Sequence, residues 1–203
     1  MDTFWIDIGY SVNSQYFAFD IRRFPRSSVD VMNDVMDYSG RRLIIITDPH
    51  IKKDLAYRVY VTGVDHDLKD DNDGIFQSIF VKTRQVTLFE GHSWPGESVW
   101  IDFMNEGAHK FWRKMYKYEY FIGTTQIYGM WIDMNEPSVA NQEDGTMPKT
   151  AIHILGDSYK VLHRDCHNVY GNMMAKATYE GLIERDQGQL RPFLLTRSAF
   201  LGT

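Results

Sequence analysis

Four short apolar segments are spaced along the chain and are separated by polar and mixed stretches. They cover residues 4–8, 43–47, 129–132 and 192–196. Each segment is nearly continuous in apolar residues, which is typical of strands that are buried on both faces of a parallel sheet. We therefore predict four parallel strands at these positions.

Helical patterns lie between the predicted strands. A first helix is expected to be capped by Ser27 or Ser28 and to end near Gly40, a second to be capped by Asn105, and a third to start at about His167. The predicted apolar faces comprise Val31, Met32, Val35 and Met36 in the first helix, Phe111, Trp112 and Met115 in the second, and Val169, Met173, Ala177 and Leu182 in the third. Alternation of strands with helices predicts βα units.

A chemically active side chain lies at the end of each predicted strand or directly after it: Asp7, Asp48, Asp133 and Arg197. Polar groups at the carboxyl ends of several parallel strands are typical of the active-site face of a (β/α)₈ barrel. We therefore predict an α/β fold, a partial (β/α)₈ TIM barrel of about four βα units, because a full barrel takes about 250 residues. The long mixed stretch at about residues 55–96 is expected to be an insertion.

Composition and charge narrow the class of protein. The chain has 203 residues, of which 43% are hydrophobic, so it can bury a core and is not disordered as a whole. A net charge of −5 without a basic stripe argues against a nucleic-acid partner. No apolar run is long enough to cross a membrane, and no signal-peptide pattern is visible. The single cysteine, Cys166, excludes a disulfide framework.

Both ends of the chain lie in apolar sequence. The chain starts in the first strand-like segment and stops at residues 200–203, directly after another apolar stretch. Domains usually end in exposed polar segments. We therefore expect the chain to be a piece of a longer protein.

Two motifs invite a metal-binding or catalytic interpretation. The Asp-Asn-Asp-Gly run at 71–74 looks like part of a calcium loop, but with Gly74 at position six the required oxygen ligands fall on Lys69 and Phe80. A solvated turn is therefore favoured. His163 and His167 are four residues apart and could share a helix face as metal ligands. A structural role at a helix start is the favoured alternative.

Residues 131–138, with the sequence Trp-Ile-Asp-Met-Asn-Glu-Pro-Ser, give the strongest chemical signal. An apolar strand delivers Asp133, and the chain then bends into Glu136 and a proline that interrupts any helix. Trp131 offers an apolar wall for a sugar ring. On residue types alone, a catalytic carboxylate and a buried strand with a solvated acidic turn both stay open.

Five motifs in the same order along the chain resemble glycoside hydrolase family 31, the α-glucosidase family. They lie at residues 4–8, 47–51, 93–96, 131–138 and 191–200. A further segment, residues 163–171, is most similar to the glucosidase II group of this family, whose catalytic α subunit trims glucose from N-linked glycans in the endoplasmic reticulum. Two departures are Gly9, where an acidic residue is common, and His92, where the glucosidase II group usually has an aromatic residue.

The resemblance implies a retaining exo-α-glucosidase that works without a metal or organic cofactor. Asp133 matches the family's nucleophile, and Glu136 is expected to support the turn that carries it. Asp7 and Arg197 are expected to bind sugar hydroxyls, and Arg197 to help keep Asp133 ionised. The other implied substrate-binding residues form an apolar wall, which comprises Ile51, Trp94, Trp131 and Met134.

The resemblance also implies parts that this chain does not supply. A retaining mechanism needs an acid/base carboxyl group about 5–5.5 Å from the nucleophile. The family's acid/base Asp lies on a later strand and matches no residue here, so we expect residues 1–203 alone to be inactive. The first barrel strand, an N-terminal β-sandwich and C-terminal domains are also expected elsewhere.

Substrate, partner and location follow from the same resemblance. The expected substrate is an α-glucoside or a glucosylated N-glycan, the expected partner a glucosidase II β subunit, and the expected location the lumen of the endoplasmic reticulum. The alternative function is a carbohydrate-binding or inactive relative that keeps the sugar pocket. A second alternative is a metal-dependent hydrolase that uses His163, Asp165 and His167.

Overall fold

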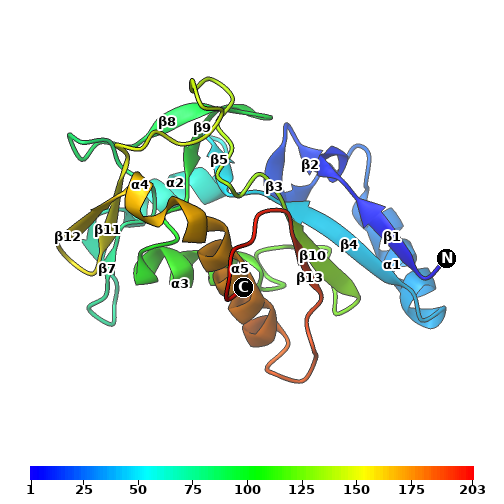
Figure 1. The fold of residues 1–203 in the computed structure, drawn as a ribbon. Helices are drawn as coiled ribbons and strands as arrows, with labels where there is room; N and C mark the ends of the chain where they lie inside the picture. Colours follow the sequence, from blue (N-terminus) through cyan, green and yellow to red (C-terminus); the bar gives the residue numbers. More distant parts are fainter.

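A four-stranded parallel sheet organises the computed structural model, which describes residues 1–203 (Figure 1). The strands, in sheet order, are β1 (Thr3–Ile6), β4 (Arg42–Thr47), β10 (Tyr128–Ile132) and β13 (Leu194–Thr196). All neighbours in this sheet are parallel, so the four predicted strands are confirmed. A closed barrel of this class has eight parallel strands. Four parallel strands that neighbour one another in chain order agree with the prediction of a partial (β/α)₈ barrel.

Burial explains the position of each strand in the sheet. In β4 every residue after Arg42 is buried, and β10 is buried at all positions except the half-buried Trp131. Apolar side chains on both faces suit the two central strands of a parallel sheet. β1 and β13 form the two edges of the sheet and are largely half-buried or exposed.

Three long helices pack beside the sheet (Figure 1). They are α1 (Arg26–Tyr38), α3 (Glu106–Met115) and α5 (Tyr170–Arg185). α5 follows a short α-helix, α4 (His163–Cys166), and a 3-10 helix, η2 (His167–Val169). The predicted cap of α3 is confirmed, because Oδ1 of Asn105 accepts a hydrogen bond from the amide of Ala108 at 3.2 Å. The third predicted helix, from about His167, is confirmed, because the 3-10 helix η2 begins at His167 and runs directly into α5. None of the helices has both the length and the apolar character needed to cross a bilayer.

The prediction for α1 was wrong in its cap and in part of its apolar face. Pro25 occupies the cap position without a side-chain hydrogen bond, and Val31 and Val35 are exposed. The buried stripe instead contains Asn33, whose amide donates to the carbonyl of Gly123 and whose Oδ1 accepts from the hydroxyl of Tyr128, both at 2.9 Å. A polar residue with satisfied hydrogen bonds thus occupies a position that hydropathy assigns to the surface.

Residues 55–96 form α2 (Arg58–His66), β6 (Lys69–Asp70), β7 (Phe76–Gln77) and β8 (Glu90–Ser93). β8 forms a hairpin with β9 (Gly96–Trp100), and β9 pairs with β5 (His50–Lys52). Residues 55–96 contribute Tyr57, Val59, Tyr60, Ile79 and Phe80 to the main hydrophobic core. This stretch is therefore packed largely on the sheet region, while Val81 and Phe89 join a second, smaller hydrophobic cluster with Trp100, Val139, Met147 and Ala151. The other small elements are η1 (Ile8–Tyr10) and the hairpins β2 (Ser11–Val12) with β3 (Gln15–Phe19) and β11 (Ile152–Leu155) with β12 (Tyr159–Leu162).

Candidate active site at the carboxyl ends of the strands

The carboxyl ends of the parallel strands carry the predicted charged side chains. Asp7, Asp48, Asp133 and Arg197 each follow the last residue of a strand directly. The register aligns three of these ends, pairing Thr47 with Ile132 and Ile132 with Thr196. Asp48, Asp133 and Arg197 therefore leave neighbouring strands at the same level of the sheet.

Arg197 links the end of β13 to the turn that follows β10. Its Nε and Nη2 each donate to one carboxylate oxygen of Glu136 at 2.8 Å. Nε also lies 2.9 Å from Oδ1 of Asp133, and Nη2 lies 3.1 Å from the sulfur of Met134. A bidentate pair of this kind fixes the guanidinium in one orientation. Glu136 thus holds Arg197 beside Asp133.

The side chain of Asp133 is mostly buried but keeps some contact with solvent. Its side chain is 14% exposed, and its Oδ1 is buried beside Arg197 without a directed hydrogen bond, because the Nε–H of Arg197 points to Glu136. Oδ2 is therefore the oxygen that faces outward. Burial raises the pKa of Asp133, the charge of Arg197 lowers it, and the charges of Glu136 and Asp7 raise it, with a net rise. Arg197 acts in the expected direction, but burial outweighs it.

Asn135 joins the two loops that carry Asp133 and Arg197. Its Nδ2 donates to Oγ1 of Thr196 at 2.8 Å, and its Oδ1 accepts from the amide of Ser198 at 3.0 Å. The start of α5 packs directly against both loops at Gly171, where a Cβ would lie 2.8 Å from the carbonyl of Ser198 and 3.0 Å from that of Asn135. The sequence analysis assigned no role to Asn135 or Gly171. The position of Asn135, between Asp133 and Glu136, was the signal that could have indicated its role.

The predicted apolar wall is only partly assembled. The rings of Trp131 and Trp5 lie 5.5 Å apart, and Trp94 is 68% exposed at the tip of the β8–β9 hairpin. Met134 has a φ of +56°, a strained backbone conformation for a long side chain that is often found at functional sites. Ile51 has no exposed surface and packs in the core. In this structure Ile51 is therefore not part of the surface that a sugar could contact.

Two further carboxyl groups differ sharply in exposure. Asp7 is exposed, and its Oδ1 accepts from the amide of Ile8 at 2.6 Å. Asp48 is fully buried and shares a hydrogen bond with the hydroxyl of Tyr16. The pKa of Asp48 is raised to about 8, chiefly by burial and also by the negative charges of Asp133 and Asp7, against the lowering effects of the Tyr16 hydrogen bond and the charge of Arg197.

Comparison with known proteins identifies the family. The sequence matches the profile described as "Glycosyl hydrolases family 31 TIM-barrel domain" over residues 1–203. The chain belongs to glycoside hydrolase family 31. It is 39% identical over its whole length to neutral alpha-glucosidase C of Macaca fascicularis and to glucosidase 2 subunit alpha of Schizosaccharomyces pombe, and it spans 24% and 20% of these two proteins.

Solved structures of family 31 agree with this assignment. A crystal structure of the ER glucosidase II heterodimeric complex, consisting of the catalytic subunit and the binding domain of the regulatory subunit, superposes with a TM-score of 0.85. The match has 39% identity and covers 99% of this chain and 20% of that chain. The structure of a family 31 alpha-glucosidase from Bacteroides thetaiotaomicron superposes with a TM-score of 0.73 at 32% identity. This match covers 99% of the present chain and 29% of the Bacteroides chain. The chain thus spans about a fifth to a quarter of the length of its curated relatives.

The cluster of this family 31 domain that comes nearest to a metal site is formed by His153, His163 and Cys166. Their candidate ligand atoms lie within 4.8 Å of one another, and all three residues are buried. The ring nitrogens, however, form a hydrogen-bonded chain: Asp102 Oδ1 to His153 Nδ1 at 2.6 Å, His153 Nε2 to His163 Nδ1 at 2.9 Å, and His163 Nε2 to His167 Nδ1 at 2.8 Å. The nitrogens face one another and do not converge on a common point, which fits a structural role. Asp165 points outward, with its side chain 58% exposed.

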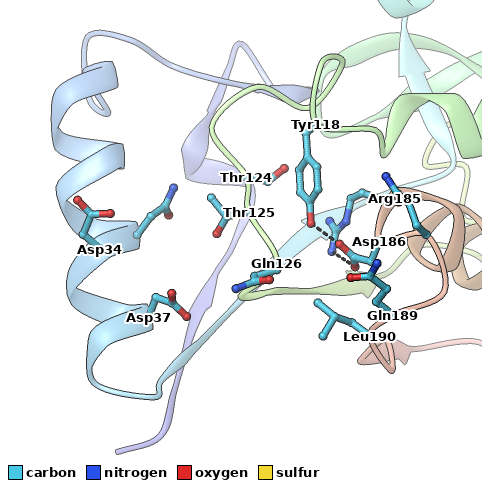
Figure 2. Close-up of a pocket in the computed structure, with 12 residues that line it drawn as sticks. Asp34, Asp37, Tyr118, Thr124, Thr125, Gln126, Arg185, Asp186, Gln189 and Leu190 are labelled. Atoms are coloured by element: carbon cyan, nitrogen blue, oxygen red, sulfur yellow. Dashed lines mark hydrogen bonds and ion pairs between the residues drawn. The ribbon is translucent and has the colours of Figure 1, made fainter.

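A polar cavity of about 490 Å³ lies at the amino ends of the parallel strands, opposite the candidate active site (Figure 2). It is formed where α1, the segment before β10 and the end of α5 meet. Arg185 lies over the ring of Tyr118 at 5.0 Å and donates to the carbonyl of Tyr128 at 3.1 Å. Tyr118 in turn donates to Asp186. The amino-terminal face of a (β/α)₈ barrel serves stability rather than catalysis, so we assign this network to the framework of the domain.

Proposed function

We propose that the protein containing this chain is a retaining α-glucosidase in which Asp133 is the nucleophile. The position of Asp133 supports this role most directly. It directly follows a central buried strand, its Oδ1 lies 2.9 Å from Nε of Arg197, and its Oδ2 faces outward. One oxygen is thus held by a cation while the other is free to react, which a nucleophilic carboxylate requires.

The reaction has two displacements. Asp133 Oδ2 attacks the anomeric carbon, the glycosidic bond breaks, and a general acid protonates the departing oxygen. The resulting glycosyl ester is hydrolysed by water, which gives its proton to the same group acting as a base. We assign that group to a later strand of the complete barrel, outside residues 1–203, together with the β-sandwich and the C-terminal domains. The chain then forms part of the catalytic barrel, with residues 55–96 as an insertion.

Recognition of glucose is assigned to residues around Asp133. Asp7 is exposed and able to accept hydrogen bonds from sugar hydroxyls, and Arg197 is half-exposed and able to donate them. Trp94, Trp131 and Met134 supply apolar surface for the ring faces. Glu136 does not react in this proposal, because both of its oxygens are bound to Arg197.

The relatives suggest the natural substrate, partner and location. One is named as a glucosidase 2 alpha subunit, and a similar structure is a complex with the binding domain of a regulatory subunit. We propose that the protein acts on glucosylated N-glycans in the endoplasmic reticulum lumen and binds a regulatory β subunit. Co-purification of a tagged full-length protein with that subunit tests the partnership.

The test of the reaction uses the full-length protein and p-nitrophenyl α-D-glucoside. Proton NMR should show α-glucose as the first product, because two displacements retain the anomeric configuration. Asp133→Asn should abolish turnover but still bind glucose. β-Glucose as the first product contradicts a retaining reaction. Glucose binding by the wild-type protein without turnover supports the carbohydrate-binding alternative.

A further inference from the structure

Asp48 is a buried carboxyl group without a paired cation. Its side chain has no exposed surface, Oδ2 shares a hydrogen bond with the hydroxyl of Tyr16, and Oδ1 has no partner. The basic nitrogen within 4 Å is Nε2 of His50, at 3.6 Å. Burying an ionised carboxylate in this way is strongly disfavoured.

The surroundings of Asp48 do not supply the missing positive charge. Burial lowers the pKa of His50 to about 3, so its ring is neutral. The charge of Arg197 lowers the pKa of Asp48, but the guanidinium is bound to Glu136 and lies against Asp133, so burial outweighs it. The other titratable groups around Asp48 are two acids, Asp7 and Asp133, and four tyrosines, Tyr10, Tyr16, Tyr57 and Tyr116. Burial is the first cause of a raised pKa in each of the four tyrosines, so they too are uncharged.

We propose that Asp48 is an uncharged carboxylic acid that starts a hydrogen-bond chain through Tyr16 and His50 to Ser93, and that this chain positions the neighbouring Trp94 at the sugar site. Asp48 is then a positioning residue and not a catalytic one. The role of Trp94 rests on the proposed function.

A proton on Asp48 determines the direction of every bond in the chain. The hydroxyl of Tyr16 would donate to an ionised Asp48, but with the proton on Asp48 the acid O–H donates to the oxygen of Tyr16 and the hydroxyl is free to donate to Nε2 of His50, 2.9 Å away. A neutral His50 that accepts at Nε2 carries its proton on Nδ1. Nδ1–H therefore donates to Oγ of Ser93, which lies at 3.2 Å.

The end of this chain is the turn that bears Trp94. Ser93 pairs with Gly96 across the β8–β9 hairpin, so Trp94 and Pro95 form its tip. Because Trp94 is 68% exposed, its position depends on how the hairpin is anchored. On the other side, the amide of His92 donates to Oδ1 of Asn141 at 2.9 Å. The His50–Ser93 bond ties the turn to the strand region that carries Asp48.

The charge state of Asp48 is tested by the stability of Asp48→Asn relative to the wild type, measured by thermal unfolding of the full-length protein between pH 4 and 8. A group protonated in the fold but ionised when unfolded lowers stability as pH rises from 3.8 to about 8. The amide does not titrate and donates to Tyr16 through Nδ2. The Tm of Asp48→Asn minus the Tm of the wild type should therefore increase as pH rises across this range. A difference that stays constant or falls overturns the proposal.

The positioning role is tested by a matched pair of tyrosine variants. Tyr16→Phe breaks the chain, whereas Tyr57→Phe removes another buried hydroxyl, which donates to the backbone carbonyl of Tyr16 at 3.0 Å. Both should lower Tm to a similar extent. Tyr16→Phe alone should raise the KM for maltose about fivefold, since about 1 kcal/mol of anchoring is lost, with a smaller change in kcat. Equal KM values for the two variants refute the positioning role.

The two tests separate this inference from the proposed function. The stability comparison needs no enzymatic activity, so it still reports on Asp48 if the full-length protein does not cleave maltose. In an active protein, Asp48→Leu should raise KM as Tyr16→Phe does, and Asp48→Asn should recover most of the loss. Equal defects in Asp48→Asn and Asp48→Leu contradict a role for an uncharged donor.

Discussion

Arg197 is shared by two acidic side chains of one turn: its Nε lies 2.8 Å from Oε1 of Glu136 and 2.9 Å from Oδ1 of Asp133. The N–H is directed at Glu136, so Asp133 receives the charge of the guanidinium without the hydrogen bond. Competition between these two carboxylates sets how strongly Asp133 is held. The pH at which Asp133 ionises should therefore depend on Glu136.

Glu136→Gln should shift the acid limb of kcat/KM to lower pH. The substitution removes a negative charge that raises the pKa of Asp133 and frees Arg197 to bind Asp133 directly. Both effects favour the ionised nucleophile, so activity should persist at lower pH. The maximal kcat should fall about tenfold, because a more tightly held carboxylate is a poorer nucleophile.

The matched control is Glu143→Gln, which removes an exposed charge further along the same loop. It should leave the acid limb where it is. The interpretation of the Arg197 contacts is wrong if the limb of Glu136→Gln stays in place or moves to higher pH.

Asp7→Ala should lower kcat/KM by about 10²–10³-fold, because hydrogen bonds to sugar hydroxyls strengthen in the transition state. The side chain of Asp7 makes only a local hydrogen bond, to the amide of Ile8, so Tm should change little. Asp2→Ala, an exposed acid beside the same strand, serves as the control. A loss of Tm with unchanged kcat/KM would return Asp7 to a structural role.

His153 should make stability depend on pH on the alkaline side. Burial opposes its charged form, but the charge and hydrogen bond of Asp102 outweigh burial and raise its pKa from 6.5 to about 9. The unfolded chain releases this proton near pH 6.5, so the contribution is complete below that value and is lost as pH rises through about 9.

His153→Gln should therefore have a lower Tm at pH 6 and a smaller fall in Tm between pH 6 and 10 than the wild type. Removing one partner of a buried pair costs about 3–5 kcal/mol. His66→Gln, which changes an exposed histidine, should behave as the wild type does. Parallel Tm curves for His153→Gln and the wild type would show that the pair with Asp102 carries no charge.

The parts of the fold that follow from local sequence were predictable. Near-continuous apolar runs such as residues 43–47 identify the strands of a parallel sheet, because both of their faces are buried. The spacing of polar residues then placed Asp133 and Arg197 at the same edge of that sheet. Asn105 was likewise recognisable as a helix cap, which depends on residues close in sequence.

The parts that depend on distant partners were not predictable from a single sequence. Asn33 is buried because its amide bonds to Gly123, 90 residues away, which no hydropathy pattern reveals. The chain from Asp48 through Tyr16 also joins segments more than 30 residues apart. Ile51 was assigned to the sugar site by resemblance, yet in this structure it is buried in the core. Tertiary packing decided each of these positions.

The most direct test of the account is covalent labelling of the nucleophile. Incubation of the full-length protein with 5-fluoro-α-D-glucosyl fluoride, whose fluoride leaves without protonation, should trap the glycosyl ester that a retaining mechanism requires. Digestion and tandem mass spectrometry should locate one label on Asp133, and Asp133→Asn should remain unlabelled. A label on Asp7, Asp48 or Glu136, or inactivation without any covalent adduct, would contradict the assignment of Asp133 as the nucleophile.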